Sequence, residues 1–184
     1  MKRGIAVLLA AALAAGCQGS AKGSRHMRPE LEAPAEAWKG VGTIVVMPPD
    51  NWTSDLGLEY IGWYRAVINE LVRERGYAAV PVAEVNRFML SNKFALGGEV
   101  RLYGVDELAR TFKADAVMYW NITAGGPVLE IFIDKADGTK LWSSGEVRLK
   151  LKFNAYPSGG YHGSDDEFAM VLGDIVRRLP GRQP

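Results

Sequence analysis

The sequence is poor in the residues that build most catalytic and metal sites. Its 184 residues include one cysteine, Cys17, and two histidines, His26 and His162. A single cysteine excludes an intramolecular disulfide and a cysteine-rich zinc site, and two histidines leave little material for a histidine-based one. Charge of one sign is not in excess either, since 22 Lys and Arg stand against 21 Asp and Glu. Because nucleic-acid binding needs spare cations to neutralise phosphates, that class of protein is excluded as well.

A long apolar run is also missing, since the run at residues 5–15 is shorter than the ~20 residues that a membrane-spanning helix needs. It follows the positive Lys2 and Arg3 and ends in small residues, a pattern that predicts a secretory signal peptide at residues 1–16. The only cysteine stands at the exit of this segment. There, Leu13-Ala14-Ala15-Gly16-Cys17 resembles the lipobox of bacterial lipoproteins.

The lipobox resemblance implies that the chain is cut before Cys17 and that the Cys17 thiol carries a diacylglyceryl group. The alternatives are a buried structural cysteine, or an ordinary signal peptide with a coincidental cysteine. Gln18 in the next position, rather than Asp, implies by the same resemblance a lipid anchor in the outer membrane, with the protein on its periplasmic face. Cleavage lowers the basic count from 22 to 20, against 21 acidic residues. Bulk charge therefore gives the mature chain no attraction to anionic lipids.

Residues 17–37 are rich in Gly, Ser, Ala, Glu and Pro and have no apolar period, which predicts a lipidated flexible tether. Residues 38–184 fit one domain that is large enough to bury a core. Within it, apolar runs predict strands at residues 43–47, 77–81, 116–122 and 128–133, with alternation at residues 147–153. Helices are predicted from residues 53–55 to 75, and at 82–90, 105–112 and 164–179.

The order of these elements predicts the fold class. The first strand, the long helix and the second strand form a βαβ crossover, which sets the two strands parallel. Asp137-Gly138 between apolar runs predicts a hairpin, and hence a β-meander before the C-terminal helix. We therefore expect a single layered α/β domain with a mixed β-sheet.

Four motifs in this order resemble a known family: Thr43-Ile-Val-Val-Met-Pro-Pro-Asp-Asn51, Glu74-Arg-Gly-Tyr-Ala-Ala-Val-Pro-Val82, Phe112-Lys-Ala-Asp-Ala-Val-Met-Tyr119 and Asp137-Gly-Thr-Lys-Leu-Trp142. They are similar to bacterial lipoproteins whose domain is like the amino-terminal domain of TolB. That family is related to, and often encoded beside, CsgG-like curli-secretion lipoproteins. The resemblance spans residues 40–153. It implies a TolB-like fold, no catalytic activity and assembly with other envelope proteins.

Catalytic patterns are weak in this sequence. No G-x-S-x-G elbow is present, and the glycine pairs at 97–98 and 125–126 lack the Lys-Ser/Thr of a phosphate loop. His162 has Asp165 and Asp166 nearby as orienting carboxylates, but acidic residues at a helix start favour the helix dipole without any catalytic role. We expect no enzyme activity, no catalytic residue, no metal and no cofactor besides the lipid on Cys17.

The segment Pro48-Pro49-Asp50-Asn51-Trp52 leaves the carboxyl end of a predicted central strand, the side of an open α/β sheet where ligands bind. Trp52, together with Trp63 on the next helix, forms a candidate aromatic surface for a partner. Pro48, Pro49, Asn51, Trp52 and Trp63 are thus the candidate interaction loop. The alternative, left open, is that Trp52 only packs the loop onto the core.

Three functions fit these patterns. The first is a non-catalytic outer-membrane lipoprotein that binds another periplasmic or outer-membrane protein, such as the CsgG-like pore or scaffold that the resemblance implies. The second is an outer-membrane activator of a peptidoglycan synthase. The third is a small-ligand binder or hydrolase that uses the Asn51 loop. Assembly into homo-oligomers is left open, and nucleic-acid partners are not expected.

Overall fold

The chain folds as one mixed β-sheet with helices on both faces. A computed structural model describes residues 29–51, 58–123, 128–148, 154–155, 161–162 and 165–182. The helices and strands are, in chain order, β1 Leu31–Glu32, η1 Ala35–Trp38, β2 Thr43–Val46, α2 Leu58–Glu74, β3 Ala78–Ala79, α3 Val82–Ser91, η3 Gly97–Leu102, α4 Val105–Phe112, β4 Ala116–Thr123, β5 Val128–Lys135, β6 Lys140–Ser143, β7 Val147–Arg148, β8 Asn154–Ala155, β9 Tyr161–His162 and α5 Asp165–Val176, where η marks a 3-10 helix.

The sheet is mixed, as predicted. Its strands lie in the order β1-β6-β5-β4-β2-β3, and β7 pairs with β5 beside this path. β2 runs parallel to β3 and β4, whereas β4, β5 and β6 are antiparallel neighbours. The βαβ crossover through α2 is confirmed, and so is the hairpin between β5 and β6. Gly76 after α2 (φ 91) and Gly138 in the hairpin turn (φ 87) adopt the left-handed backbone that favours glycine.

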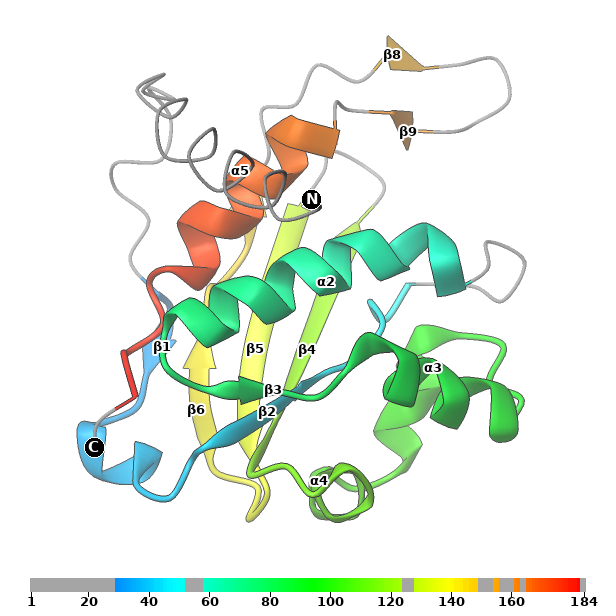
Figure 1. Cartoon of the computed structure of the whole chain (residues 1–184). Helices are drawn as coiled ribbons and strands as arrows, with labels where there is room; N and C mark the ends of the chain where they lie inside the picture. The colour runs from blue at the N-terminus through cyan, green and yellow to red at the C-terminus, as the bar shows by residue number, and fades with distance from the viewer. Residues whose placement is uncertain are drawn as a thin grey trace, which may run out of the picture.

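Two hydrophobic clusters lie on opposite faces of the sheet, because successive residues of a strand point to opposite sides. Ile44 and Val46 of β2 belong to the first cluster, and Val45 belongs to the second. Figure 1 shows α2 and α5 lying over the same face, and both helices contribute residues to the first cluster. α3 and α4 contribute to the second cluster. The face under α3 and α4 carries the candidate site described below.

Polar contacts join segments that are far apart in the chain. The Asp115 Oδ2 atom, just before β4, accepts hydrogen bonds from the backbone N–H groups of Gly42 and Thr43, both at 2.9 Å. At the C-terminal end, the Tyr77 hydroxyl donates to the Pro180 carbonyl at 2.9 Å, and the Arg75 Nε donates to the Leu179 carbonyl at 2.7 Å. These contacts fix the start of β2 and the end of the chain against the sheet.

The last part of the predicted tether, residues 17–37, belongs to the folded domain, because β1 and most of η1 lie within it. β1 pairs antiparallel with β6, and Ala33 donates its N–H to the Leu141 carbonyl at 2.8 Å. Ala33 and Ala37 also pack against the first hydrophobic cluster. A two-residue strand has no apolar period, and its partner lies about 110 residues away in the sequence. For these reasons, patterning did not detect it.

Other predictions are refined in detail. The segment 91–104, predicted as a loop, contains the 3-10 helix η3. β8 and β9 pair antiparallel as a small separate sheet, where the sequence predicted no strands at 154–155 and 161–162 beyond the end of the alternating run. Of the predicted strand at residues 147–153, the structure describes only β7, in which Val147 is buried. The signal peptide, Cys17 and the first part of the tether lie outside them.

Candidate functional site

Among the described residues, helices cover only one half of the second face of the sheet. α3, η3 and α4 pack over β2 and β4 with Val45, Val117 and Tyr119. Farther along the sheet, Ile131 and Ile133 of β5 are buried in the first cluster. The alternate residues Glu130, Phe132 and Asp134 therefore point to the second face, where they are only half-buried. The open half of this face is made by β5, β6 and β1.

A groove of about 640 Å³ lies on this open half. Its size is in the range of ordinary ligand sites. Its apolar residues are Leu31 of β1 and Phe132 of β5, while Trp142 of β6 borders it but is buried in the first cluster, on the opposite face of the sheet. Five charged side chains and one hydroxyl complete it, namely Glu30, Arg101, Glu130, Asp134, Lys140 and Ser143. We refer to these nine residues as the open-face groove.

Arg101 of η3 forms one wall of the groove through contacts to three elements. Its Nε and Nη2 atoms donate to Asp50 Oδ2 at 2.9 and 2.8 Å. Its guanidinium also lies 4.4 Å from the ring centroid of Tyr119 and 4.5 Å from that of Phe132. Each such cation–π contact contributes ~0.5–1 kcal/mol at an exposed site. Burial raises the pKa of the Tyr119 hydroxyl to about 12, although the positive charge of Arg101 acts against this rise.

Asp50 holds the end of β2 at the point where the connections from neighbouring parallel strands go to opposite faces. Its N–H donates to the Trp120 carbonyl, and its carbonyl accepts from the Gly98 N–H, both at 2.9 Å. In open α/β sheets ligands bind at such a point. Here the space is filled by the protein's own Asp50–Arg101 pair. The groove opens beside this pair, over β5 and β6.

The groove has an excess of negative charge. Because Arg101 is paired with Asp50, three carboxylates among the described side chains of the groove, Glu30, Glu130 and Asp134, stand against the ammonium of Lys140. Among the described residues, Glu130 and Asp134 make no ion pair within 4.0 Å. Burial raises the pKa of Asp134 above its ordinary value of 3.8, against the opposing effect of Lys140 and Arg101. The carboxylates of the groove are thus short of cationic partners.

We expect the raised pKa of Asp134 to appear as a pH-dependent cost in stability. The folded state holds the Asp134 proton more tightly than the unfolded chain does. The free energy of unfolding therefore falls as the pH rises from 3.8, the ordinary pKa, through the raised pKa of the folded state. Asp134→Asn should therefore raise the midpoint of thermal unfolding at pH 7, and this gain should vanish below the ordinary pKa. Calorimetry of both proteins over this pH range measures the effect. An equal gain at every pH would contradict it.

The groove offers contacts for recognition rather than a recognisable reaction centre. In the part of the chain that the structure describes, no group of three or more His, Cys, Asp or Glu side chains is placed to hold a metal ion. Nor is any helix of the described residues long and apolar enough to cross a membrane. The groove combines acidic groups with an apolar floor, which suits a cationic ligand with an aliphatic stem.

The residues of the candidate interaction loop do not form one surface. Pro48 and Pro49 are buried, so they present no surface to a partner, and this part of the prediction is corrected. Asn51 is exposed, and Trp52 lies outside the described residues. Trp63 is 45% exposed on α2, with its ring edge-on to Tyr64 at 5.0 Å. Of the four residues that the structure describes, Pro48, Pro49, Asn51 and Trp63, none lines the open-face groove.

Sequence patterning missed the residues of the groove. A signal was present in β5, where Glu130 and Asp134 interrupt an apolar run at alternate positions. Two acidic residues in such a strand indicate a half-exposed face. No comparable signal exists for Arg101, whose partner Asp50 is 51 residues away. His162 lies in β9, and the structure describes only its backbone.

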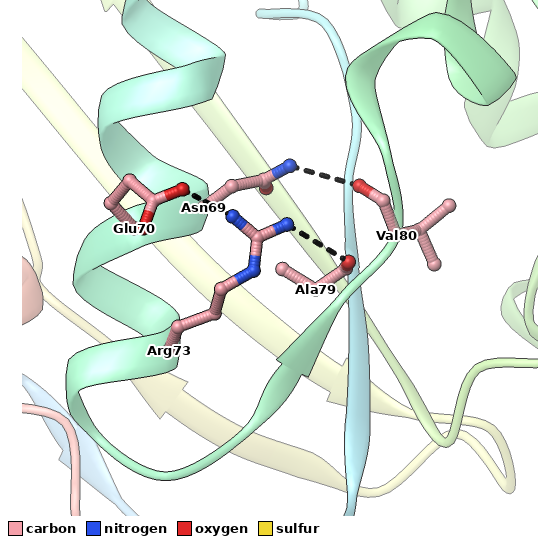
Figure 2. Close-up of polar contacts among 5 residues, drawn as sticks. All are labelled: Asn69, Glu70, Arg73, Ala79 and Val80. Atoms are coloured by element: carbon pink, nitrogen blue, oxygen red, sulfur yellow. Dashed lines mark hydrogen bonds and ion pairs between the residues drawn. The ribbon is translucent and has the colours of Figure 1, made fainter. Parts of the chain in front are cut away.

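The two edges of the sheet differ in how they are covered. At β3, side chains of α2 occupy the backbone carbonyls, as Figure 2 shows. Asn69 Nδ2 donates to the Val80 carbonyl at 2.9 Å, and Arg73, which is paired with Glu70, donates to the Ala79 carbonyl at 3.4 Å. Covering an edge in this way discourages pairing with a further strand. The other edge, β1, pairs only with β6 among the described residues and borders the groove.

Fold and site together define a small α/β module with a recognition groove on a half-covered sheet. The chain belongs to the GNA1162-like lipoprotein family, whose model matches residues 39–150. The match spans both sheet faces and most of the groove. The prediction of a bacterial lipoprotein family is thereby confirmed, while its TolB-like and CsgG-related part stays a prediction.

Three solved structures are similar to this chain at low identity. Lipoprotein GNA1162 from Neisseria meningitidis is 22% identical, with 73% of this chain and 92% of that chain covered and a TM-score of 0.49. LpoB from E. coli is 16% identical, with 59% and 57% covered and a TM-score of 0.43. A PelC dodecamer from Paraburkholderia phytofirmans is 17% identical, with 78% and 90% covered and a TM-score of 0.39. No curated protein sequence matches the chain.

Proposed function

We propose that this protein is a non-catalytic lipoprotein, anchored in the outer membrane through Cys17, that binds another envelope protein on the periplasmic side. The observation that carries the proposal is its membership in a lipoprotein family over residues 39–150. The signal peptide and lipobox pattern ending at Cys17 support the anchor. Two or more acyl chains give stable attachment, because each buried methylene contributes ~0.8 kcal/mol.

The open-face groove supports binding as the role of the folded domain. It joins an apolar floor, formed by Leu31 and Phe132, to carboxylates that make no ion pair among the described residues. Interfaces commonly combine an apolar centre with a polar rim in this way. No nucleophile with an orienting base is part of the groove, so its chemistry favours recognition over catalysis.

The length of the tether limits where the partner lies. Because β1 begins at Leu31, only the 11 residues 18–28 separate Cys17 from the described domain. Fully extended, they span about 40 Å at most. This bound favours a partner that comes close to the membrane, such as a CsgG-like lipoprotein or another outer-membrane protein. A peptidoglycan synthase would have to reach outward to meet the domain.

Cross-linking in intact cells tests the proposal. We expect the full chain, cross-linked with formaldehyde and purified under denaturing conditions, to carry one envelope protein in near-stoichiometric amounts by quantitative mass spectrometry. The Cys17→Ser chain should lose most of it, because the partner and the domain are no longer held at the same membrane. A CsgG-like protein would make the chain a secretion accessory, and a peptidoglycan synthase would make it an activator. No enriched envelope protein in either sample would refute the proposal.

A further inference from the structure

The open-face groove and the free edge of the sheet are parts of one surface. Glu30 and Leu31 line the groove and also lie at or beside β1, the strand that pairs only with β6 among the described residues. Leu31 is 37% exposed there. The opposite edge at β3 has its carbonyls occupied by Asn69 and Arg73. One edge is therefore covered, whereas the other has no further strand beside it among the described residues and borders an acidic groove.

We propose that the open-face groove binds an extended basic segment of the partner protein, which passes over β1 into the groove and places Lys or Arg side chains beside Glu130 and Asp134. This inference rests on the proposed function, since it names the chemistry of the partner's binding segment. The entry past β1 is not blocked by another strand of the described residues, because β1 pairs only with β6 among them.

The charge of the groove selects a basic segment. Arg101 is held by Asp50, so among the described side chains of the groove Lys140 is the cation left to balance Glu30, Glu130 and Asp134. A partner cation placed beside Asp134 favours its ionised form, which burial disfavours in the free protein. The ring of Phe132, next to Glu130 and Asp134 on the same face of β5, supports the aliphatic stem of a Lys or Arg side chain.

The shape of the surface favours an extended segment over a helix. β1 has two residues, so backbone pairing along it supplies few hydrogen bonds. Most of the affinity must come from side chains that reach the groove. In an extended segment alternate side chains point to the same side, about 7 Å apart, so two side chains four residues apart match Glu130 and Asp134, which are also four residues apart along β5. A helix would place its neighbours at a different period.

A synthetic probe tests this directly. The probe is a fluorescein-labelled octapeptide of four Lys-Val repeats, titrated with the full chain in mild detergent and followed by fluorescence anisotropy. We expect saturable binding that weakens at high salt, because partly exposed ion pairs are screened. An octapeptide of four Glu-Val repeats should not bind. Equal binding of both peptides, or binding of neither, would overturn the proposal.

Variants locate the binding to the groove. The Glu130→Gln and Asp134→Asn double variant should bind the Lys-Val probe about tenfold more weakly, as expected for the loss of two partly exposed ion pairs. The matched double variant Glu84→Gln with Glu107→Gln removes two exposed carboxylates from α3 and α4 and should bind as the parent does. Leu31→Lys, which adds a like charge at β1, should weaken binding again. Equal affinity for all four proteins would mean that the probe binds elsewhere, and would refute the groove as its binding site.

Two further samples separate the explanations. If the probe binds only a chain that lacks residues 18–28, the protein's own basic segment with Lys22, Arg25 and Arg28 is the occupant, and the proposal of a partner segment is wrong. In intact cells, the Glu130→Gln with Asp134→Asn chain should lose the cross-linked partner. If it keeps a partner that the parent also carries, the groove proposal fails while the proposed function stands. If the parent itself carries none, the proposed function fails, whatever the probe shows.

Discussion

Replacing Cys17 by Ser should release the protein from the outer-membrane fraction almost completely. A serine hydroxyl is not the thiolate that accepts the diacylglyceryl group, so the chain should carry no acyl chains. It should appear either in the periplasm, if the signal peptide is cut at another bond, or in the inner membrane, if the signal peptide is kept. Since a stable anchor depends on two or more acyl chains, no partial retention is expected. Fractionation of cells, with metabolic labelling by an alkyne fatty acid, measures attachment and lipidation together.

The sequence offers a matched control for this experiment. Cys17 is the only cysteine, so no other thiol can accept lipid in its place. Gly16→Ala keeps a small residue before Cys17 and should leave labelling and fractionation unchanged. If the Cys17→Ser protein were processed and fractionated like the parent, Cys17 would not carry the anchor, and the proposed location in the outer membrane would be wrong.

The second large effect should come from Asp115→Ala. Asp115 Oδ2 accepts two backbone hydrogen bonds at the start of β2, from Gly42 and Thr43. Hydrogen bonds to a charged group contribute ~1.5–3 kcal/mol each. Losing both should lower the free energy of unfolding by about 3–5 kcal/mol, because two partly buried N–H groups lose their acceptor. Urea unfolding followed by tryptophan fluorescence measures this.

Two variants set the scale for the Asp115 result. Asp115→Asn keeps one carbonyl oxygen as an acceptor but removes the charge, so its effect should be intermediate. Asp106→Ala removes an exposed carboxylate whose partner is Arg110 one helical turn away, and should cost only ~0.5 kcal/mol. If Asp115→Ala were no more destabilising than Asp106→Ala, the contact to β2 would not stabilise the fold as described.

Elements with a strong local pattern were predicted correctly. The buried run of β2, the long amphipathic α2 and the apolar β4 each contain their own periodic signal within consecutive residues. Gly76 and Gly138 mark the end of a helix and the turn of a hairpin, because both positions need a positive φ. The parallel arrangement of β2 and β3 follows from the crossover rule alone.

Features that depend on distant partners were not predicted. β1 exists because its backbone pairs with β6, far away in the chain, and two residues carry no period of their own. Pro48 and Pro49 were predicted to face a partner, but the chain continues along β4 after β2 ends, with Met47 and Asp50 donating to Met118 and Trp120. The two prolines are therefore buried. Whether they are exposed or buried depends on the contact of residues 47–50 with β4, which no local pattern encodes.

The sequence by itself determined the family, the α/β class, the βαβ start and the pattern that predicts an anchor at Cys17. All of these depend on residues that are neighbours in the chain or on motifs in a fixed order. Only the tertiary structure decided that Arg101 meets Asp50, that one edge of the sheet is covered while β1 has no further strand beside it among the described residues, and that Glu30, Glu130 and Asp134 share one groove. The physical reason is that a binding surface is made by contacts between distant segments, and these exist only after the sheet has formed.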